Sequence, residues 1–136
     1  MEINFDDYFK VSILSKELFR ITLSGFWNKE VANDVGPKMV ATFRQSVDGF
    51  QGPFYVIADL TDFSNPNMDT KNYMRQAMTY AKQKGLIKTI EVIPKATMRL
   101  GVKNIGKKAD IRDHQIAVGS MEEAFNVLRE LGVSVE

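Results

Sequence analysis

The sequence contains no cysteine and a single histidine, His114, among its 136 residues. Without cysteine the chain forms no disulfide bond, and it has no thiolate that binds a metal or acts as a nucleophile. One histidine does not make a zinc site, and nothing in the spacing around His114 indicates a Ser-His-Asp triad. We therefore expect no metal, no cofactor and no enzymatic activity, with His114 at the surface or at the edge of a strand.

The sequence also lacks a long apolar run and an excess of one charge. No segment approaches the ~20 apolar residues that span a bilayer, and residues 1–7 have neither the basic nor the apolar region of a signal peptide. Eighteen basic and seventeen acidic side chains give a formal net charge of +1, which provides no general attraction for nucleic acid. From these absences and the chain length we expect a single cytoplasmic domain over residues 1–136, with no membrane span and no nucleic-acid partner.

The first part of the chain alternates as strands do and then changes to a helical period. Apolar residues at every second position predict strands over residues 9–13 and 19–23, joined as a hairpin. Apolar residues four apart then predict a helix from Val31 to Val47, capped by Asn28. Because proline removes a helix hydrogen bond and clashes with the preceding turn, Gly36-Pro37 predicts a kink or two helical pieces.

The rest of the chain repeats units of strand, polar loop and helix. A capping box at Ser120–Glu123 predicts the start of the last helix, whose buried face we expect to include Phe125 and Leu131. The predicted elements are a strand at 54–60, a helix at 69–84 ended by Gly85, a strand at 87–93, a less regular helix at 98–109, a strand at 115–118, a helix at 120–131 and a short tail strand at Val133 and Val135.

The predicted order, β-β-α-β-α-β-α-β-α, indicates an α/β fold with a mixed, mostly parallel sheet of four to five strands and about four helices. In such folds a polar loop between a buried strand and a helix N-terminus is typical of a binding site. Residues 59–70 form that kind of loop here. The candidate ligand- or partner-binding residues are Asp59, Thr61, Asp62, Ser64, Asp69 and Thr70.

Three short motifs accompany these elements in a fixed order. Gly25-Phe26-Trp27 ends the second strand, the pattern Ala-x-x-x-Gly-Leu at 81–86 ends the middle helix, and Ser-x-Glu-Glu-Ala-Phe at 120–125 opens the last helix. The central strand ends in Asp59-Leu60-Thr61 before its polar loop. With these motifs the chain resembles, over nearly its whole length, the STAS domain of bacterial anti-sigma-factor antagonists and their SpoIIAA-like relatives.

The resemblance implies a STAS-like fold and a regulatory domain that binds a protein partner. In the antagonists, the loop after the central strand carries a phosphorylatable serine at a helix N-terminus, in an Asp-Ser-Ser-Gly context. The nearest equivalent here is Met68–Lys71, which has neither the serine pair nor the glycine. The resemblance therefore makes Thr70 the first candidate for modification and Ser64 the second.

Each candidate also has a simpler structural explanation. Asp59, Asp62 and Asp69 would suit a hard cation or acid–base chemistry if they converged. Aspartates more often cap turns and helices, however, and we favour that role for all three. Thr70 is likewise explained by a hydroxyl that caps a helix.

We expect a non-enzymatic STAS-like regulatory or protein-interaction domain, switched near Thr70, that is a monomer or a homodimer. The alternative is a domain that binds a small apolar molecule or a lipid in a pocket between helices and sheet. Phe26 and Trp27 are candidates for aromatic contacts with either kind of partner, although packing in the core is the commoner role. The ligand-binding alternative predicts a cavity lined by Phe26, Trp27, Met39, Phe43, Met74 and Met78.

Overall fold

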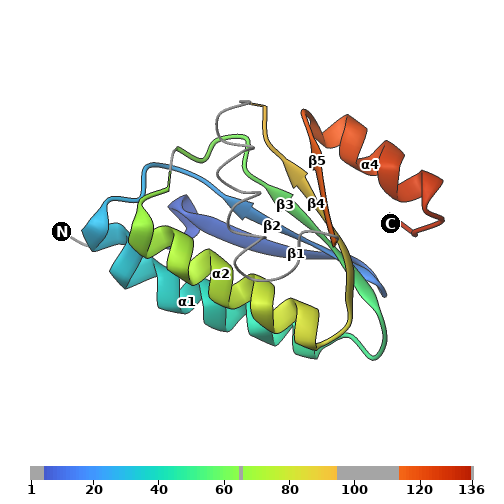
Figure 1. Cartoon of the computed structure of the whole chain (residues 1–136), viewed down its shortest axis with the longest axis horizontal. Helices are drawn as coiled ribbons and strands as arrows, with labels where there is room; N and C mark the ends of the chain where they lie inside the picture. The colour runs from blue at the N-terminus through green and yellow to red at the C-terminus, as the bar shows by residue number, and fades with distance from the viewer. Residues whose placement is uncertain (1–4, 65, 95–113, 136) are drawn as a thin grey trace.

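The computed structural model of the chain describes residues 5–64, 66–94 and 114–135. This part of the chain forms one sheet of five strands, three α-helices and a short 3-10 helix, η1 (Figure 1). The elements are η1 (Phe5–Asp7), β1 (Phe9–Ser15), β2 (Leu18–Leu23), α1 (Lys29–Asp48), β3 (Phe54–Asp59), α2 (Met68–Gln83), β4 (Leu86–Val92), β5 (Gln115–Val118) and α4 (Met121–Glu130).

The strands lie in the sheet in chain order, β1-β2-β3-β4-β5. β1 and β2 form the predicted antiparallel hairpin, and the strands from β2 to β5 are parallel, which confirms a mixed, mostly parallel sheet. The helix predicted at 98–109 lies outside the described residues. Of the helices that the structure does describe, none is long and apolar enough to cross a membrane.

His114 stands directly before β5, half-buried, with Nδ1 3.0 Å from the Ile87 carbonyl oxygen of the neighbouring strand β4. β5 is the last strand of the sheet in the described part of the chain. The prediction that His114 lies at a strand edge is therefore confirmed.

The central strand β3 is buried on both faces of the sheet. Val56 and Ala58 belong to a core beneath α1 and α2, whereas Ile57 between them belongs to a second core beneath α4. Figure 1 shows α1 and α2 side by side and α4 apart from them, beyond β5. Because helices cover both faces, β3 is a continuous apolar run rather than an alternating one.

The helix α1 is continuous from Lys29 to Asp48, so the prediction of two helical pieces at Gly36-Pro37 is wrong. Proline at 37 has no N–H to donate to the Asn33 carbonyl, but both residues lie on the exposed side of α1, so that carbonyl is accessible to solvent. Gly36 faces α2 instead. A Cβ at this position would lie 2.3 Å from a ring carbon of Tyr73, so glycine permits the close approach of the two helices.

The last helix begins as predicted and ends at Glu130, one residue before the predicted end. The Ser120 hydroxyl accepts a hydrogen bond from the Glu123 N–H (3.2 Å), and the Glu123 carboxylate accepts one from the Gly119 N–H (3.1 Å). Leu131 is the C-cap of α4 and is 45% exposed. It was expected on the buried face of the helix, and that prediction is wrong because the helix has ended where Leu131 begins the turn.

The tail strand predicted at Val133 and Val135 is also wrong, since residues 133–135 form no strand. Side chains at the end of β1 and in the following turn bind the tail instead of a backbone ladder. The Ser15 hydroxyl donates to the Ser134 carbonyl (2.9 Å), and the Ser134 N–H donates to the Glu17 carboxylate (3.1 Å). Val133 is nevertheless buried in the core under α4, which explains its apolar character.

Candidate functional site

The loops that follow β2 and β3 leave the sheet at the same edge, because these strands are parallel, and they remain paired. Gly25 and Phe63 form an isolated parallel bridge. The Gly25 N–H donates to the Asp62 carbonyl oxygen (2.9 Å), and the Ser64 N–H donates to the Gly25 carbonyl oxygen (3.1 Å). The Gly-aromatic motif therefore lies against the polar loop that was predicted to form the site.

The two helices that follow these loops are capped in the same way. The Val31 N–H donates to Asn28 Oδ1 (2.8 Å), and the Thr70 N–H donates to Asn67 Oδ1 (2.9 Å). The prediction that Asn28 caps the first helix is confirmed. The Asn67 amide also donates to the Trp27 carbonyl oxygen (2.9 Å). This bond ties one cap to the other and fixes the N-termini of α1 and α2 relative to each other.

The two aromatic residues of the motif have opposite environments. Trp27 is 1% exposed, its ring makes edge contacts with Tyr8 and Phe63, and its Nε1–H donates to the Ser24 carbonyl oxygen (2.9 Å). Phe26 is 64% exposed. Trp27 therefore has the commoner role of the two considered, packing in the core, whereas Phe26 remains available for an aromatic contact with a partner.

Met68, the first residue of α2, is a second large apolar side chain at this end of the molecule and is 62% exposed. It follows Asn67, whose side chain bonds to the carbonyl next to Phe26, so the two exposed residues lie on adjoining segments. Asp62 and Ser64 on the paired loop are exposed as well. We call the area formed by Phe26, Asp62, Ser64 and Met68 the loop surface.

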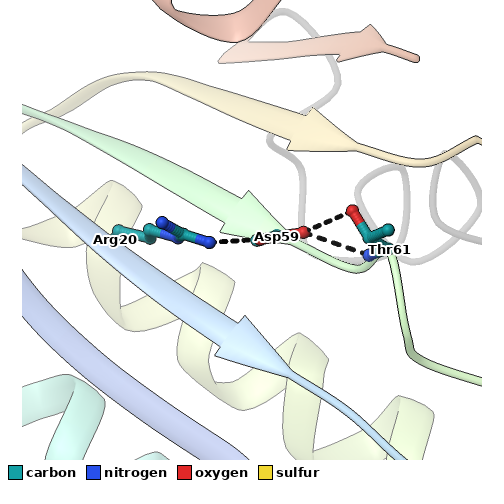
Figure 2. A network of polar contacts seen from close by, with 3 residues as sticks. All are labelled: Arg20, Asp59 and Thr61. Atoms are coloured by element: carbon teal, nitrogen blue, oxygen red, sulfur yellow. Dashed lines mark hydrogen bonds and ion pairs between the residues drawn. The ribbon is translucent and has the colours of Figure 1, made fainter. Parts of the chain in front are cut away.

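Asp59 ends β3 on the face of the sheet opposite α1 and α2, where it is buried (5% exposed). Its Oδ2 accepts a hydrogen bond from the Arg20 guanidinium at 2.6 Å, in an ion pair with β2 (Figure 2). Its Oδ1 accepts two from Thr61, one from the backbone N–H (3.1 Å) and one from the hydroxyl (2.6 Å). Burial by itself raises the pKa of Asp59, but the bonds from Thr61 and Arg20 favour the carboxylate and leave the pKa below its ordinary value.

The three aspartates predicted as candidate ligands do not converge. Asp59 is held by Arg20 and Thr61, whereas Asp69 lies in the first turn of α2 with Oδ2 3.4 Å from Asn33 Nδ2 of α1. Over residues 5–64, 66–94 and 114–135, no group of three acidic or histidine side chains is placed to hold a metal ion. The carboxylate-cluster hypothesis is therefore wrong for these residues. Asp59 does cap the turn at Thr61, as favoured, but the cap of α2 is Asn67 and not Asp69.

The two candidate hydroxyls for modification differ in accessibility. Thr70 is fully buried, and its hydroxyl donates to Asn67 Oδ1 (2.9 Å) inside the capped turn. A phosphoryl donor reaches Thr70 only after the first turn of α2 opens. Ser64, in contrast, is exposed on the loop surface next to Gly25.

The space between α1, α2 and the sheet is largely filled. A cavity of about 40 Å³ remains there, and four of the six predicted lining residues contribute to it (Met39, Phe43, Met74 and Met78). Phe26 and Trp27 do not line it. Pockets that hold small organic ligands are typically about 300–1,000 Å³, so this volume suits a water molecule rather than a lipid.

Sequence patterns did not indicate Arg20, Asn67 or Met68 as site residues. Arg20 alternates with the buried residues Phe19 and Ile21, which places it on the other face of β2. Its pairing with Asp59 depends on the register between β2 and β3, in which Thr22 lies opposite Asp59. Asn67 precedes a helix, which is a recognisable signal for a cap that the nearby Asp69 obscured.

Comparison with known proteins identifies the fold. No protein-family model matches the sequence, and no curated protein matches it. Two solved structures of SpoIIAA do match. One is the Bacillus cell-fate determinant in its phosphorylated form (17% identity, TM-score 0.57, 89% of this chain and 99% of that one). The other is the anti-sigma-factor antagonist in its unphosphorylated form (19% identity, TM-score 0.58, 89% of this chain and 97% of that one). This chain therefore has the STAS-like fold of SpoIIAA.

Proposed function

We propose that this chain is a non-enzymatic regulatory domain that binds another protein through the loop surface. The observation that carries the proposal is the exposure of Phe26 (64%) and Met68 (62%) on segments that hydrogen bonds join to each other. Exposed apolar side chains ringed by polar ones are typical of protein-interaction sites, where an aromatic anchor enters a pocket of the partner. Asp62 and Ser64 supply the polar rim here.

The rigidity of these loops favours binding. Side chains and loops that become ordered on association reduce affinity, so a surface that is already fixed retains more of its contact energy. The bridge between Gly25 and Phe63, the bond from Asn67 to Trp27 and the burial of Trp27 fix the backbone on either side of Phe26. The side chain of Phe26 is therefore exposed to a partner and does not contribute to the core.

The fold supports a regulatory role. One SpoIIAA structure is described as a cell-fate determinant in its phosphorylated form, and the other as an anti-sigma-factor antagonist in its unphosphorylated form. By analogy, we infer that the partner of this chain is a regulatory protein. If a hydroxyl on the loop surface is modified, geometry favours Ser64 over the buried Thr70. A phosphate there would place about two negative charges beside Phe26 and oppose entry into an apolar pocket.

Capture from an extract of the native cell tests the proposal. Immobilised wild-type protein, the double variant Phe26→Ser/Met68→Ser and a control, Leu131→Ser, are compared by mass spectrometry of the bound proteins. Leu131 is a matched control because it is also a large exposed apolar residue (45%) but lies at the end of α4. We expect the double variant to lose the specific partner by at least about tenfold, which is the effect of one hot-spot contact. Equal capture by the double variant, or equal loss in the control, would contradict the proposal.

The site of modification is tested in the same assay. Ser64→Glu is expected to reduce capture while the protein stays folded. Thr70→Glu is expected to lower the melting temperature, because a larger charged side chain must enter a fully buried position. If a stably folded Thr70→Glu protein captures less partner while Ser64→Glu captures as much as the wild type, the modification site is Thr70 and not Ser64.

A further inference from the structure

Within residues 5–64, 66–94 and 114–135, no strand pairs with the outer edge of β1. Among the strands in the described part of the chain, β1 pairs with β2 alone. An open edge presents N–H and C=O groups that pair with another strand unless a bulge, a proline or a charge prevents it. β1 contains no proline and no glycine, and its register with β2 is regular from Phe9 to Ile13. The irregularity in the ladder comes after this segment, between Ile13 and Ser15.

The side chains of this regular segment separate by face. Phe9 and Val11 pack in the core beneath α1 and α2, and Ile13, two residues further, lies on the same face. Ile13 is nevertheless 61% exposed. Lys10, the one charged residue of β1, points to the opposite face, together with Ser12. The edge therefore carries an apolar stripe that its own helices leave partly uncovered.

We propose that β1 pairs antiparallel with β1 of a second copy of this chain, about a two-fold axis at Val11, to form a homodimer with a continuous sheet. In an antiparallel strand, every second residue directs its N–H and C=O groups toward the outer edge. Two identical strands pair only if such residues face each other, so the two-fold axis passes at a residue and not between two residues. Val11 is the centre of the regular segment. In this register Ile13 lies opposite Phe9 of the partner subunit, and Lys10 lies opposite Ser12 of the partner subunit. Lysine thus meets no like charge, and the apolar stripes of the two copies join.

The charges at the two ends of β1 favour a second copy over any other occupant. η1, just before β1, exposes Asp6 and Asp7, whereas the turn after β1 exposes Lys16. The two-fold arrangement brings Lys16 of each copy opposite Asp6 and beside Asp7 of the other, so the charges at the two ends of β1 are complementary. A groove of about 410 Å³, lined by Ile13, Lys16 and Phe50 among others, lies where η1 of the partner subunit arrives.

Sedimentation velocity over a concentration series, up to about 200 µM because small interfaces bind in the micromolar range, tests the dimer. Wild-type protein is expected to associate reversibly. Ile13→Lys is expected to raise the dimer dissociation constant at least tenfold, since it places a charge in the apolar stripe, while the melting temperature of the monomer stays unchanged. Leu131→Lys, an exposed apolar residue of α4, is the control and is expected to leave the constant unchanged. A wild-type protein that is monomeric throughout, or equal effects of the two variants, would overturn the proposal.

A charge exchange tests the register independently of folding. Asp7 and Lys16 lie beyond opposite ends of β1, whose six steps from Phe9 to Ser15 span roughly 20 Å at ~3.3 Å per residue, so they do not meet within one chain. Lys16→Glu alone and Asp7→Lys alone each create two like-charge pairs per dimer and are expected to be monomeric. Mixed together, the two variants regain both opposite-charge pairs and are expected to form a heterodimer. A mixture that associates no better than either variant alone would contradict this register. This inference is independent of the proposed function, because the loop surface lies outside β1.

Discussion

The two faces of the sheet bury different kinds of core. Beneath α1 and α2, the ring of Phe19 contacts the rings of Phe43, Phe50 and Phe54, and Phe19 and Phe54 are fully buried. Beneath α4 the core is mainly aliphatic, with residues such as Ile57 and Leu128. On that face the sheet also carries the ion pair between Arg20 and Asp59.

The difference follows from the length of the covering helices. α1 and α2 have 20 and 16 residues, whereas α4 has 10 and packs on β4 and β5. Polar residues of β2 and β3 on the face of α4 are therefore free to pair with each other. We infer that, among the described residues, the first face, beneath α1 and α2, provides most of the folding free energy, and that the second, opposite face carries its ion pair on β2 and β3, away from the strands on which α4 packs.

The largest expected effect is the loss of an aromatic ring from the first face. Phe19→Ala should lower the free energy of unfolding by about 4 kcal/mol, because burial is lost and a large cavity remains. Leu128→Ala on the second face should cost less, about 2–3 kcal/mol, since a smaller side chain is removed and α4 is free to settle on the sheet. Urea denaturation of both variants measures the difference. A larger loss for Leu128→Ala would refute the ranking of the two faces.

The next effect concerns the helix layer of the first face. Gly36→Ala places a Cβ 2.3 Å from a ring carbon of Tyr73, so α1 and α2 must separate or the tyrosine must move. We expect a loss of about 2 kcal/mol from this overpacking, despite the better helix propensity of alanine. Gly52→Ala is the control, because no atom lies within 4 Å of its Cβ position. The idea fails if thermal unfolding shows Gly36→Ala to be as stable as the control.

The second face should give the chain a specific sensitivity to acid. The pKa of Asp59 is below its ordinary value, 3.8, in the folded protein, so its ion pair stabilises the fold above that value. As the pH falls through 3.8, Asp59 is protonated in the unfolded state before it is protonated in the folded state, so the stabilisation decreases. It is lost completely below the lower pKa of the folded state. Asp59→Asn should lower stability at neutral pH by about 1.5 kcal/mol and flatten its decline in acid. Denaturant titrations between neutral and acidic pH measure both; an unchanged slope would assign the acid sensitivity to other carboxylates.

Local patterns in the sequence predicted most of the fold because these elements follow their own periodicity and caps. The alternation from Phe9 to Leu23, the strand from Phe54 and the capping box at Ser120 all depend on neighbouring residues. The errors arose where tertiary contacts decided the result. Gly36-Pro37 was expected to kink α1 or to divide it into two pieces, but the packing of Gly36 on Tyr73 and the exposure of Pro37 accommodate both residues in one continuous helix.

The sequence predicted a polar loop after the buried strand, but it did not predict how the side chains of that loop pair. A polar segment after a buried strand marks the loop, and Ser64 and Asp62 are exposed there. The ion pair of Asp59 joins residues 39 positions apart and depends on strand register, which the sequence does not state. The opposite environments of Phe26 and Trp27 depend on whether each side chain reaches the core, and adjacent aromatic residues give no sign of that.

The smallest change in the free energy of unfolding is expected for Phe26, which lies on the loop surface and in neither core. Phe26 is 64% exposed and belongs to neither core, so Phe26→Ser should change the free energy of unfolding by less than about 0.5 kcal/mol. Trp27 is the single tryptophan, and its fluorescence reports directly on the neighbouring backbone. An unchanged emission spectrum, together with lost partner capture, would show that Phe26 serves recognition while Trp27 serves folding. A red-shifted spectrum would mean that the exposed ring holds the loop in place, and the distinction between a stabilising core and a recognition surface would fail at this residue.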